Sequence, residues 1–482
     1  MRFVENDREP PVSRCRTIPD QTVPAAHEPD LFADVVVAGA GGAGLTAALA
    51  AAERGLSVVL VEARETFRED SNTAMSTSMV PAAGTRQQAA AGIDDDPQLF
   101  LSDVMRKTHD AADRVVATAL VNVAAQLVHW LEDRWRIPLG LVTDFNYAGH
   151  SRHRCHSVPD RAGSTLHEHL LAAIGRLDNV LLGCPARLVD VSGNAADGVT
   201  GATVERPSGE REEVGARSVI LATNGFGASP DLVGQHCPEI AGGLYFGGEG
   251  STGDALALGE LFEADLAYLD AYQGHGSVAH PHGVLLTWAA VIHGGVLVNR
   301  AGDRFADESS GYSELARPVL EQPGGKAWMV YDERIDDLCR PFADYQRCLE
   351  AGAVLAADGI EQLAHLIGAP TAVLAATLER SAAAARAGTA DEFGRSDWAA
   401  PLAPPYRAVR VTGALFHTQG GLCVDGRARV LSQGVPIPGL FAAGGSAAGI
   451  SGHGAAGYLA GNGLLSALGL GLLAGRSALS TD

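Results

Sequence analysis

The sequence contains almost no lysine. Lys107 and Lys326 are its only lysines, and its 36 Lys plus Arg residues are outnumbered by 57 Asp plus Glu, which gives a formal net charge of −21. A charge of this sign repels nucleic acid phosphates and anionic membrane surfaces. Because no basic run offsets it, the sequence predicts neither nucleic acid nor a membrane surface as a partner.

Cysteine is also scarce. The seven cysteines are scattered, and no Cys-x-x-Cys pair occurs. This usage is typical of a reducing compartment, excludes a disulfide scaffold and encodes no metal cluster. The first thirty residues lack the apolar core of a secretion signal. We therefore interpret residues 1–30 as a disordered leader and expect the chain to be cytoplasmic.

One charge-free segment could be mistaken for a membrane span. Residues 430–475 contain no Asp, Glu, Lys or Arg, but they include many glycines, Pro436 and Pro438. Their last apolar stretch, 464–475, is shorter than the roughly 20 residues that cross a bilayer. We therefore predict no membrane span and expect this segment to be buried and to face a ligand.

Glycine, in contrast, is abundant, with 58 residues. Residues 34–38 form a short apolar run typical of a buried parallel strand, and Gly39, Gly41 and Gly44 follow in the G-x-G-x-x-G pattern before a helix of small residues. In this pattern Gly39 permits a tight turn and Gly44 allows close packing of helix and strand. Gly41 lets backbone N–H groups approach a pyrophosphate, so the pattern predicts a dinucleotide-binding loop.

An acid completes this unit. A second apolar strand over 57–61 ends at Glu62, whose carboxylate can accept both ribose hydroxyls. The N-terminus of the intervening helix offers unpaired N–H donors and a partial positive charge to phosphates. Strand, glycines, helix, strand and acid in this order predict a βαβ unit that binds a dinucleotide.

The sequence also predicts the domain plan. The strand-plus-glycine pattern returns at 218–227 and 440–445, whereas residues 266–400 combine helical stretches rich in Ala, Leu, Glu and Arg with short strands. We therefore predict an α/β fold with an inserted domain over 266–400. The dinucleotide-binding domain would then comprise 31–265 and 401–482.

Six further motifs lie along the chain, at 71–73, 222–227, 251–254, 298–305, 417–422 and 437–444. Together with the glycine fingerprint, they resemble FAD-binding 2 type flavoproteins, the family of soluble fumarate reductase, succinate dehydrogenase flavoprotein subunits and 3-ketosteroid dehydrogenases. The resemblance covers roughly residues 34–475. It implies a Rossmann-like FAD-binding domain of the GR2 type with an inserted α+β capping domain, and bound FAD. It also implies hydride transfer between flavin N5 and a carbon–carbon bond beside a carbonyl or carboxylate.

The charge-free C-terminal segment favours FAD over NAD for a separate reason, because a flavin needs a surface for its isoalloxazine ring. The last helix, opened by 461–463, would direct N–H groups at the ring and stabilise the anion formed on reduction. One departure is that Gly445 stands where the family usually has an acid. The residues assigned to FAD binding are Gly39, Gly41, Gly42, Ala43, Gly44, Glu62, Ala63, Asn72, Thr73, Thr223, Gly225, Asp254, Gly444, Gly445, Asn462, Gly463 and Leu464.

Two tyrosines are the main catalytic candidates. In fumarate reductases an arginine shortly after the Arg-Phe-x-x-Glu segment is the acid; here that segment is 304–308 and the position falls on Tyr312. The ketosteroid branch has a tyrosine there that removes the proton. Tyr458 stands near the position of the second substrate arginine. The resemblance therefore disfavours fumarate or succinate as the substrate.

Histidines point in the other direction. His417 directly precedes Thr-x-Gly-Gly, the fumarate-type arrangement, and would bind a carboxylate or a carbonyl oxygen; we assign it a catalytic role. His275 matches another substrate histidine of that branch. Arg152 and His153 belong to the locally basic cluster 150–156, which either seats an anionic or carbonyl substrate or is a surface loop balanced by nearby acids.

The leading hypothesis is an FAD-dependent dehydrogenase or reductase that acts on a carbon–carbon bond α,β to a carbonyl or carboxylate. In the desaturating direction Tyr312 would be the base, with His417 and Tyr458 polarising the substrate oxygen. The electron partner stays open between a quinone, oxygen, a nicotinamide and a protein. Two alternatives are an electron-transfer subunit of a larger redox complex and an FAD-binding protein without a reaction.

Overall fold

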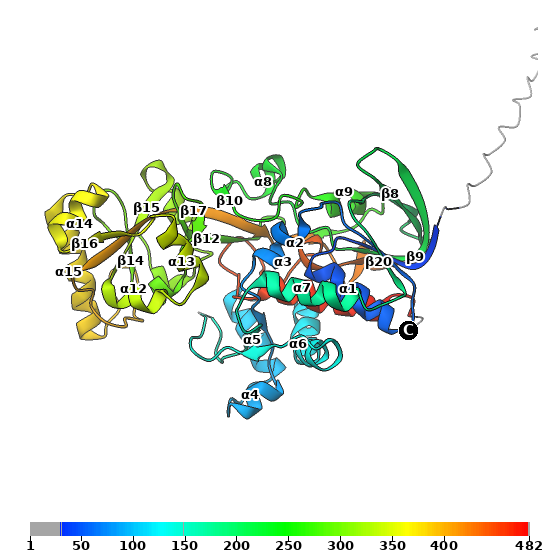
Figure 1. The fold of residues 1–482 in the computed structure, drawn as a ribbon, viewed down its shortest axis with the longest axis horizontal. Helices are drawn as coiled ribbons and strands as arrows, with labels where there is room; N and C mark the ends of the chain where they lie inside the picture. Colours follow the sequence, from blue (N-terminus) through cyan, green and yellow to red (C-terminus); the bar gives the residue numbers. More distant parts are fainter. Residues whose placement is uncertain (1–28, 30, 148, 481–482) are drawn as a thin grey trace, which may run out of the picture.

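The computed structural model describes residues 29, 31–147 and 149–480 of the chain (Figure 1). The predicted leader, 1–30, lies outside the described residues apart from Pro29. The described residues form two large sheets, each with its own helices, and two small ones; the large sheets lie at opposite ends of the molecule in Figure 1.

The first sheet is the predicted Rossmann-like element. Five parallel strands lie in the order β6 (Val180–Gly183), β2 (Val58–Val61), β1 (Leu31–Ala38), β9 (Arg211–Leu221) and β20 (Val435–Ala442). Strands β7 (Arg187–Asn194), β8 (Gly198–Glu205) and β19 (Arg429–Ser432) extend it with antiparallel pairs. All four residues of β2 are apolar and buried, as expected of a parallel strand covered on both faces.

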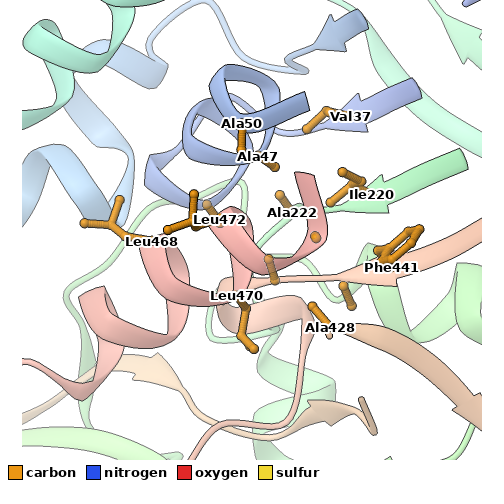
Figure 2. Close-up of a cluster of buried hydrophobic side chains, with 14 of the residues drawn as sticks. Val37, Ala47, Ala50, Ile220, Ala222, Ala428, Phe441, Leu468, Leu470 and Leu472 are labelled. Atoms are coloured by element: carbon orange, nitrogen blue, oxygen red, sulfur yellow. The ribbon is translucent and has the colours of Figure 1, made fainter. Parts of the chain in front are cut away.

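Helices α1 (Gly42–Glu53) and α16 (Asn462–Ser477) pack together against this sheet. Their close approach depends on glycine: a Cβ at Gly471 would lie 2.4 Å from Ala43 O. Leu468 and Leu472 lie in the same cluster as Ala47 of α1 (Figure 2). The charge-free segment 430–475 is therefore part of the core, which confirms the predicted burial.

Helix α6 (Arg114–Trp135) is the one described helix that is long and apolar enough to cross a membrane by length and composition. Half of the residues in its most apolar stretch are buried inside the fold. It packs on α5 (Pro97–Lys107) and α16, and Leu120, Val121 and Leu127 belong to the core. Packing against the core accounts for this apolar composition.

The second sheet forms the capping domain. Its strands lie in the order β13 (Val284–Leu285), β12 (Tyr272–Ala279), β17 (Tyr406–Thr418), β15 (Lys326–Asp332) and β14 (Val296–Val298). Strands β10 (Leu244–Tyr245) and β16 (Leu355–Ala357) also pair with β17. Helices α12 (Glu333–Cys339), α13 (Ala343–Glu350), α14 (Ile360–Ile367) and α15 (Thr371–Ala387) surround this sheet (Figure 1).

The predicted domain limits differ from this sheet at both ends. The limit at 400/401 placed β17 in the FAD-binding domain, but β17 pairs with β12 and β15 along most of its length. The capping sheet therefore includes residues up to 418, and it also takes in β10 from the preceding part of the chain.

Apart from α7, the remaining elements are short. The helices are α2 (Phe67–Asp70), α3 (Asn72–Met75), α4 (Arg86–Ala90), α7 (Gly163–Ile174), α8 (Pro230–His236), α9 (Asp254–Glu260), α10 (Ala289–Ile292) and α11 (Ala316–Leu320). The single turns are η1 (Glu308–Ser310), η2 (Pro323–Gly325) and η3 (Gly444–Ser446). The strands are β3 (Val80–Pro81), β4 (Gly140–Leu141), β5 (Cys155–Ser157), β11 (Leu266–Ala267) and β18 (Gly421–Leu422).

A buried ionic network fixes the cap segment that precedes Tyr312. The Glu308 carboxylate accepts hydrogen bonds from Arg304, from Arg395 and from Leu297 N. Arg304 and Arg395 are both buried, and Arg304 also pairs with Asp391. Because each buried charge has a partner, the Arg-Phe-x-x-Glu motif is a structural support here.

Candidate active site

The glycine loop has the close contacts that a dinucleotide fingerprint requires. Gly39 has φ +104°, and a Cβ there would lie 2.2 Å from Ala222 O. A Cβ at Gly44 would lie 1.8 Å from Gly39 O. The nearest atom to a Cβ at Gly41 is instead Thr73 Oγ1, at 3.8 Å. Packing therefore dictates two of the glycines, while the third leaves the backbone open to a phosphate.

Polar side chains hold this loop in place. Glu62 at the end of β2 accepts hydrogen bonds from Ala40 N at 2.8 Å and from Arg64 N at 2.9 Å. Burial raises the pKa of Glu62, and these hydrogen bonds oppose the rise. Thr73 Oγ1 accepts from Gly42 N at 2.9 Å. Glu62 and Thr73 thus lie beside the loop, as predicted.

His167 is a loop support that the sequence analysis missed. Its Nε2 donates to Ala40 O at 2.7 Å, and burial lowers its pKa, so the ring is neutral. Asn72, a predicted FAD residue, accepts from Gly248 N at 2.6 Å. His167 thus holds the backbone of the glycine loop, and Asn72 holds the backbone at residue 248.

Other predicted FAD residues have local roles in the structure. A Cβ at Gly225 would lie 2.1 Å from Thr418 Oγ1, so this glycine permits contact between the loop after β9 and the end of β17. A Cβ at Gly445 would lie 2.6 Å from Asn224 Oδ1. An acid at Gly445 has no room, which explains the departure from the family pattern. Asp254 pairs with Arg187 at 2.5 Å in the first turn of α9.

The start of α16 shows that the residues fit a flavin. Asn462 is fully buried, and neither its Nδ2 nor its Oδ1 has a hydrogen-bond partner among the described residues; Ser466 Oγ, one turn later, has none either. An unsatisfied buried amide is costly and calls for a ligand that both donates and accepts. The pyrimidine edge of a flavin does both.

The structure brings the predicted catalytic residues together at the border of the two domains. Tyr312 follows η1 in the cap, His275 lies on β12, His417 lies near the end of β17, and Tyr458 lies just before α16. Ring centroids are 5.0 Å apart for His275 and Tyr312, 6.1 Å for Tyr312 and Tyr458, and 5.8 Å for His417 and Tyr458. Four residues that are distant in the sequence therefore form one site.

Three further aromatic residues line this site and were not predicted. Tyr147 contacts Tyr312 with centroids 6.5 Å apart, and Trp288 contacts Tyr312 at 5.9 Å. Phe416 stacks on His275 at 5.1 Å. We call Tyr147, His275, Trp288, Tyr312, Phe416, His417 and Tyr458 the aromatic cluster. No motif contains Tyr147 or Trp288, so no sequence signal indicated them. Phe416 could have been inferred only from its position next to His417.

The aromatic cluster is uncharged. Burial raises the pKa of Tyr312 well above its usual value. Burial also raises the pKa of Tyr458, against hydrogen bonds from Gly463 N, Gly461 N and the Tyr312 side chain. Burial lowers the pKa of His417 to about 4 and that of His275 to about 3. At neutral pH the cluster therefore offers neutral phenols and imidazoles.

Cations on the elements that flank the cluster already have partners. Lys107 at the end of α5 forms an ion pair with Glu314, two residues after Tyr312, and so joins the FAD-binding domain to the cap. Arg154 is fully buried between Asp95 and Asp103, with N–O distances of 2.9 and 2.6 Å. Neither cation is available to bind a substrate carboxylate.

Arg152 and His153 make local contacts and do not join the aromatic cluster. Arg152 is exposed and donates to Asp94 O and Ser151 O, while His153 Nδ1 contacts Phe145 O at 3.2 Å. Their assignment to the substrate stays a prediction that these contacts do not favour. Arg154, the other arginine of the segment 150–156, is a structural ion-pair residue.

A glycine loop on a parallel sheet, an orphaned amide at a second helix and an aromatic cluster beneath a cap define a two-domain flavoprotein oxidoreductase. Residues 34–464 match the family model described as FAD binding domain, and the chain belongs to this family. The chain is similar to a probable fumarate reductase, Ifc3, of Shewanella frigidimarina (strain NCIMB 400). The two are 30% identical over 460 residues, which cover 94% of this chain and 76% of that protein.

Two solved structures are similar over most of their length. The open conformation of a flavocytochrome c3 fumarate reductase has a TM-score of 0.76 and 28% identity, covering 93% of this chain and 78% of that one. The 3-ketosteroid-Δ4-(5α)-dehydrogenase of Rhodococcus jostii RHA1, in complex with 4-androstene-3,17-dione, has a TM-score of 0.74 and 25% identity. It covers 95% of this chain and 99% of that one.

These relatives settle the cofactor and the class of reaction. Fumarate reduction and ketosteroid dehydrogenation both act on a carbon–carbon bond next to a carboxylate or a carbonyl. The chain is an FAD-dependent oxidoreductase that acts on such bonds, as the sequence predicted.

Proposed function

We propose that the chain desaturates a cyclic ketone next to its carbonyl group and is not a dicarboxylate reductase. The observation that carries this proposal is that the site offers neutral phenols and imidazoles, while the flanking cations Lys107 and Arg154 are already held in ion pairs. A carboxylate moved into this buried site would lose its hydration without gaining a counter-charge. A ketone oxygen needs only hydrogen-bond donors, which the phenols and imidazoles supply.

Three polar side chains of the cluster act on the substrate in this reaction. His417 and Tyr458 donate hydrogen bonds to the ketone oxygen and stabilise the negative charge that develops on it. Tyr312 takes the proton from the adjacent carbon. FAD supplies the hydride chemistry at its N5 atom. The flavin-binding loop and the base Tyr312 thus lie on different domains, which meet at the cluster.

The proton on Tyr312 needs an outlet. Since burial raises the pKa of Tyr312, its phenol stays protonated at neutral pH, so it can accept a proton only while it gives up its own. Two phenols of the FAD-binding domain contact Tyr312: Tyr458, which already serves the ketone oxygen, and Tyr147, whose ring meets Tyr312 nearly at right angles. We assign the next step of the proton transfer to Tyr147.

The electron acceptor and the location belong to the same proposal. Reduced FAD would pass its electrons to a quinone, oxygen, a nicotinamide or a partner protein. The six cysteines among the described residues are all free, which supports a reducing compartment such as the cytoplasm.

Anaerobic mixing of the FAD-loaded protein with candidate substrates tests this proposal. We expect cyclohexanone derivatives to bleach the flavin absorbance and succinate to leave it unchanged. The Tyr312→Phe variant should lose the bleaching, whereas Tyr331→Phe should keep it, because Tyr331 is a buried cap tyrosine that contacts Tyr345 instead. Rapid oxidation of the reduced flavin by fumarate, with no response to any ketone, would show that the chain is a dicarboxylate reductase.

A further inference from the structure

We propose that Gln419 holds His417 as a neutral donor with its proton on Nε2, and that this pair makes the site select a carbonyl oxygen over a carboxylate. Gln419 would be a positioning residue that acts through His417. The selectivity part rests on the proposed function, whereas the state of the imidazole stands on the contacts of Gln419 alone.

The contact between the two side chains decides the tautomer. Gln419 Nε2 lies 2.7 Å from His417 Nδ1. Nδ1 has one further contact, to Thr418 O at 3.4 Å, which is much the longer of the two. An amide nitrogen only donates, so at the short contact Nδ1 is the unprotonated acceptor. The ring proton then sits on Nε2, the nitrogen on the other side of the ring.

The Gln419 side chain is itself held in this orientation. Its Oε1 accepts from Ser451 Oγ at 3.1 Å, and its side chain is buried. Its backbone is fixed by hydrogen bonds from Gln419 N to Ala271 O at 2.7 Å and from Gly449 N to Gln419 O at 2.8 Å. The amide is therefore held at both of its ends, by His417 at the nitrogen and by Ser451 at the oxygen.

The other edge of the ring faces the start of α16. A Cβ at Gly463 would lie 2.9 Å from both Nε2 and Cε1 of His417, so only glycine fits there. The positive end of the helix dipole disfavours an imidazolium at this position. Tyr458 is the titratable side chain in ring contact with His417, and among the described residues no carboxylate hydrogen bonds to the imidazole.

A neutral imidazole suits one substrate class and not the other. It donates one hydrogen bond to a carbonyl oxygen, but it brings no charge to balance a carboxylate. A glutamate at 419 would accept a hydrogen bond from Nδ1–H, which would favour the doubly protonated ring. The choice between amide and carboxylate at this position thus decides which oxygen His417 binds.

Nitrogen NMR on FAD-loaded protein with labelled histidine tests the tautomer without any turnover. His417 is assigned by the signal lost in His417→Asn. We expect an unprotonated Nδ1 and a protonated Nε2 from pH 8 down to pH 5. In Gln419→Glu the same ring should become doubly protonated over this range, and Gln419→Met should show a mixture of tautomers. Gln433→Glu, an exposed residue, is the matched control and should leave His417 unchanged.

Ligand binding tests the selectivity, with 2-cyclohexen-1-one and crotonate as probes and the flavin absorbance as the signal. We expect Gln419→Glu to weaken the binding of cyclohexenone about tenfold and to strengthen the binding of crotonate by a similar factor. The doubly protonated ring would place a positive charge next to the substrate oxygen, which favours the carboxylate of crotonate. Gln419→Met should weaken cyclohexenone alone. If Gln419→Glu fails to fold, Gln419→Met and Ser451→Ala carry the test.

Two outcomes would overturn the inference. One is a wild-type spectrum with the proton on Nδ1 of His417, which would mean that Gln419 turns its amide oxygen, and not its nitrogen, toward the ring. The other is a Gln419→Met variant with unchanged tautomer and unchanged preference between the two probes. A wild type with the expected tautomer that oxidises no ketone would instead refute the proposed function and leave the role of Gln419 in the tautomer intact.

Discussion

The two long helices that pack against the FAD-binding sheet begin in different ways. Helix α1 begins in a glycine loop where Gly39 and Gly44 are fixed by backbone contacts, so it presents backbone alone. Helix α16 begins at Asn462, whose buried amide is unpaired among the described residues, and abuts His417 and Tyr458. The start of α1 is suited to the pyrophosphate, the group that all dinucleotides share. The start of α16 uses side chains, so the substrate chemistry can change there without disturbing the fold.

The largest effect is expected at the start of α1. In Gly44→Ala the new Cβ would lie 1.8 Å from Gly39 O, and backbone atoms have no room to move. We expect a loss of about 4 kcal/mol or more in the free energy of unfolding, together with loss of FAD. Thermal unfolding and the ratio of flavin to protein absorbance measure both.

Gly41→Ala is the matched control for this prediction. Its Cβ would have 3.8 Å of space and its φ of −75° suits alanine, so the fold should keep its melting temperature. FAD affinity should still fall about tenfold, because the methyl group narrows the approach of the pyrophosphate. Equal destabilisation by both substitutions would contradict the idea that the three glycines have separate roles.

At the α16 side the expected effect is on chemistry and not on folding. Tyr312→Phe should slow flavin reduction by a ketone by about 10²–10⁴-fold, the usual contribution of an acid–base group. Its FAD content and melting temperature should stay close to wild type, since the ring contacts with His275 and Trp288 remain. Stopped-flow absorbance gives the rate, and an unchanged rate would remove Tyr312 from the mechanism.

Acid should act on both helix starts through buried histidines. His417 keeps a pKa of about 4 in the fold against 6.5 in the unfolded chain. Between these values the unfolded chain binds a proton that the folded chain does not, so the free energy of unfolding falls as the pH falls from 6.5 towards 4. Each such histidine contributes a slope of up to about 1.4 kcal/mol per pH unit.

The variant His417→Gln should show a shallower loss of melting temperature over this pH range. His282→Gln, at an exposed position, should reproduce the wild-type curve. Parallel curves for all three proteins would mean that His417 is not neutral in the folded state.

The smallest effect separates cofactor binding from stability at α16. Asn462→Leu removes two buried polar atoms that lack partners, so the apoprotein should keep its stability or gain about 1 kcal/mol. FAD affinity should drop about tenfold, because one hydrogen-bonding edge is lost. Fluorescence titration with FAD and thermal unfolding of the apoprotein provide the two numbers. Loss of stability in the apoprotein would show that the amide has a structural partner.

The FAD-binding half of the site was predictable because its signals are local. Gly39, Gly41, Gly44 and Glu62 lie within one βαβ unit, and their spacing alone predicts that unit. The ribose contact assigned to Glu62 stays a prediction. The approximate place of Tyr312, His417 and Tyr458 followed from motifs in the resemblance, and the structure brings them together.

The rest depends on contacts between distant parts of the chain. The basic composition of 150–156 gave no hint that Arg154 is held by Asp95 and Asp103, about fifty residues earlier. Tyr147 reaches Tyr312 only because the cap folds over the first domain, and Trp288 reaches it from another segment of the cap. The amide of Gln419 has meaning only once Ser451 and His417 are placed beside it.

The scarcity of lysine has a practical consequence. Lys107 and Lys326 are the only side-chain amines in the protein, and Lys107 is paired with Glu314 across the two domains. An amine-reactive label can modify Lys107 only when that pair separates, whereas Lys326 serves as an internal reference on the cap. The ratio of the two labelling rates, measured by mass spectrometry, therefore reports how often the cap opens in the wild-type protein.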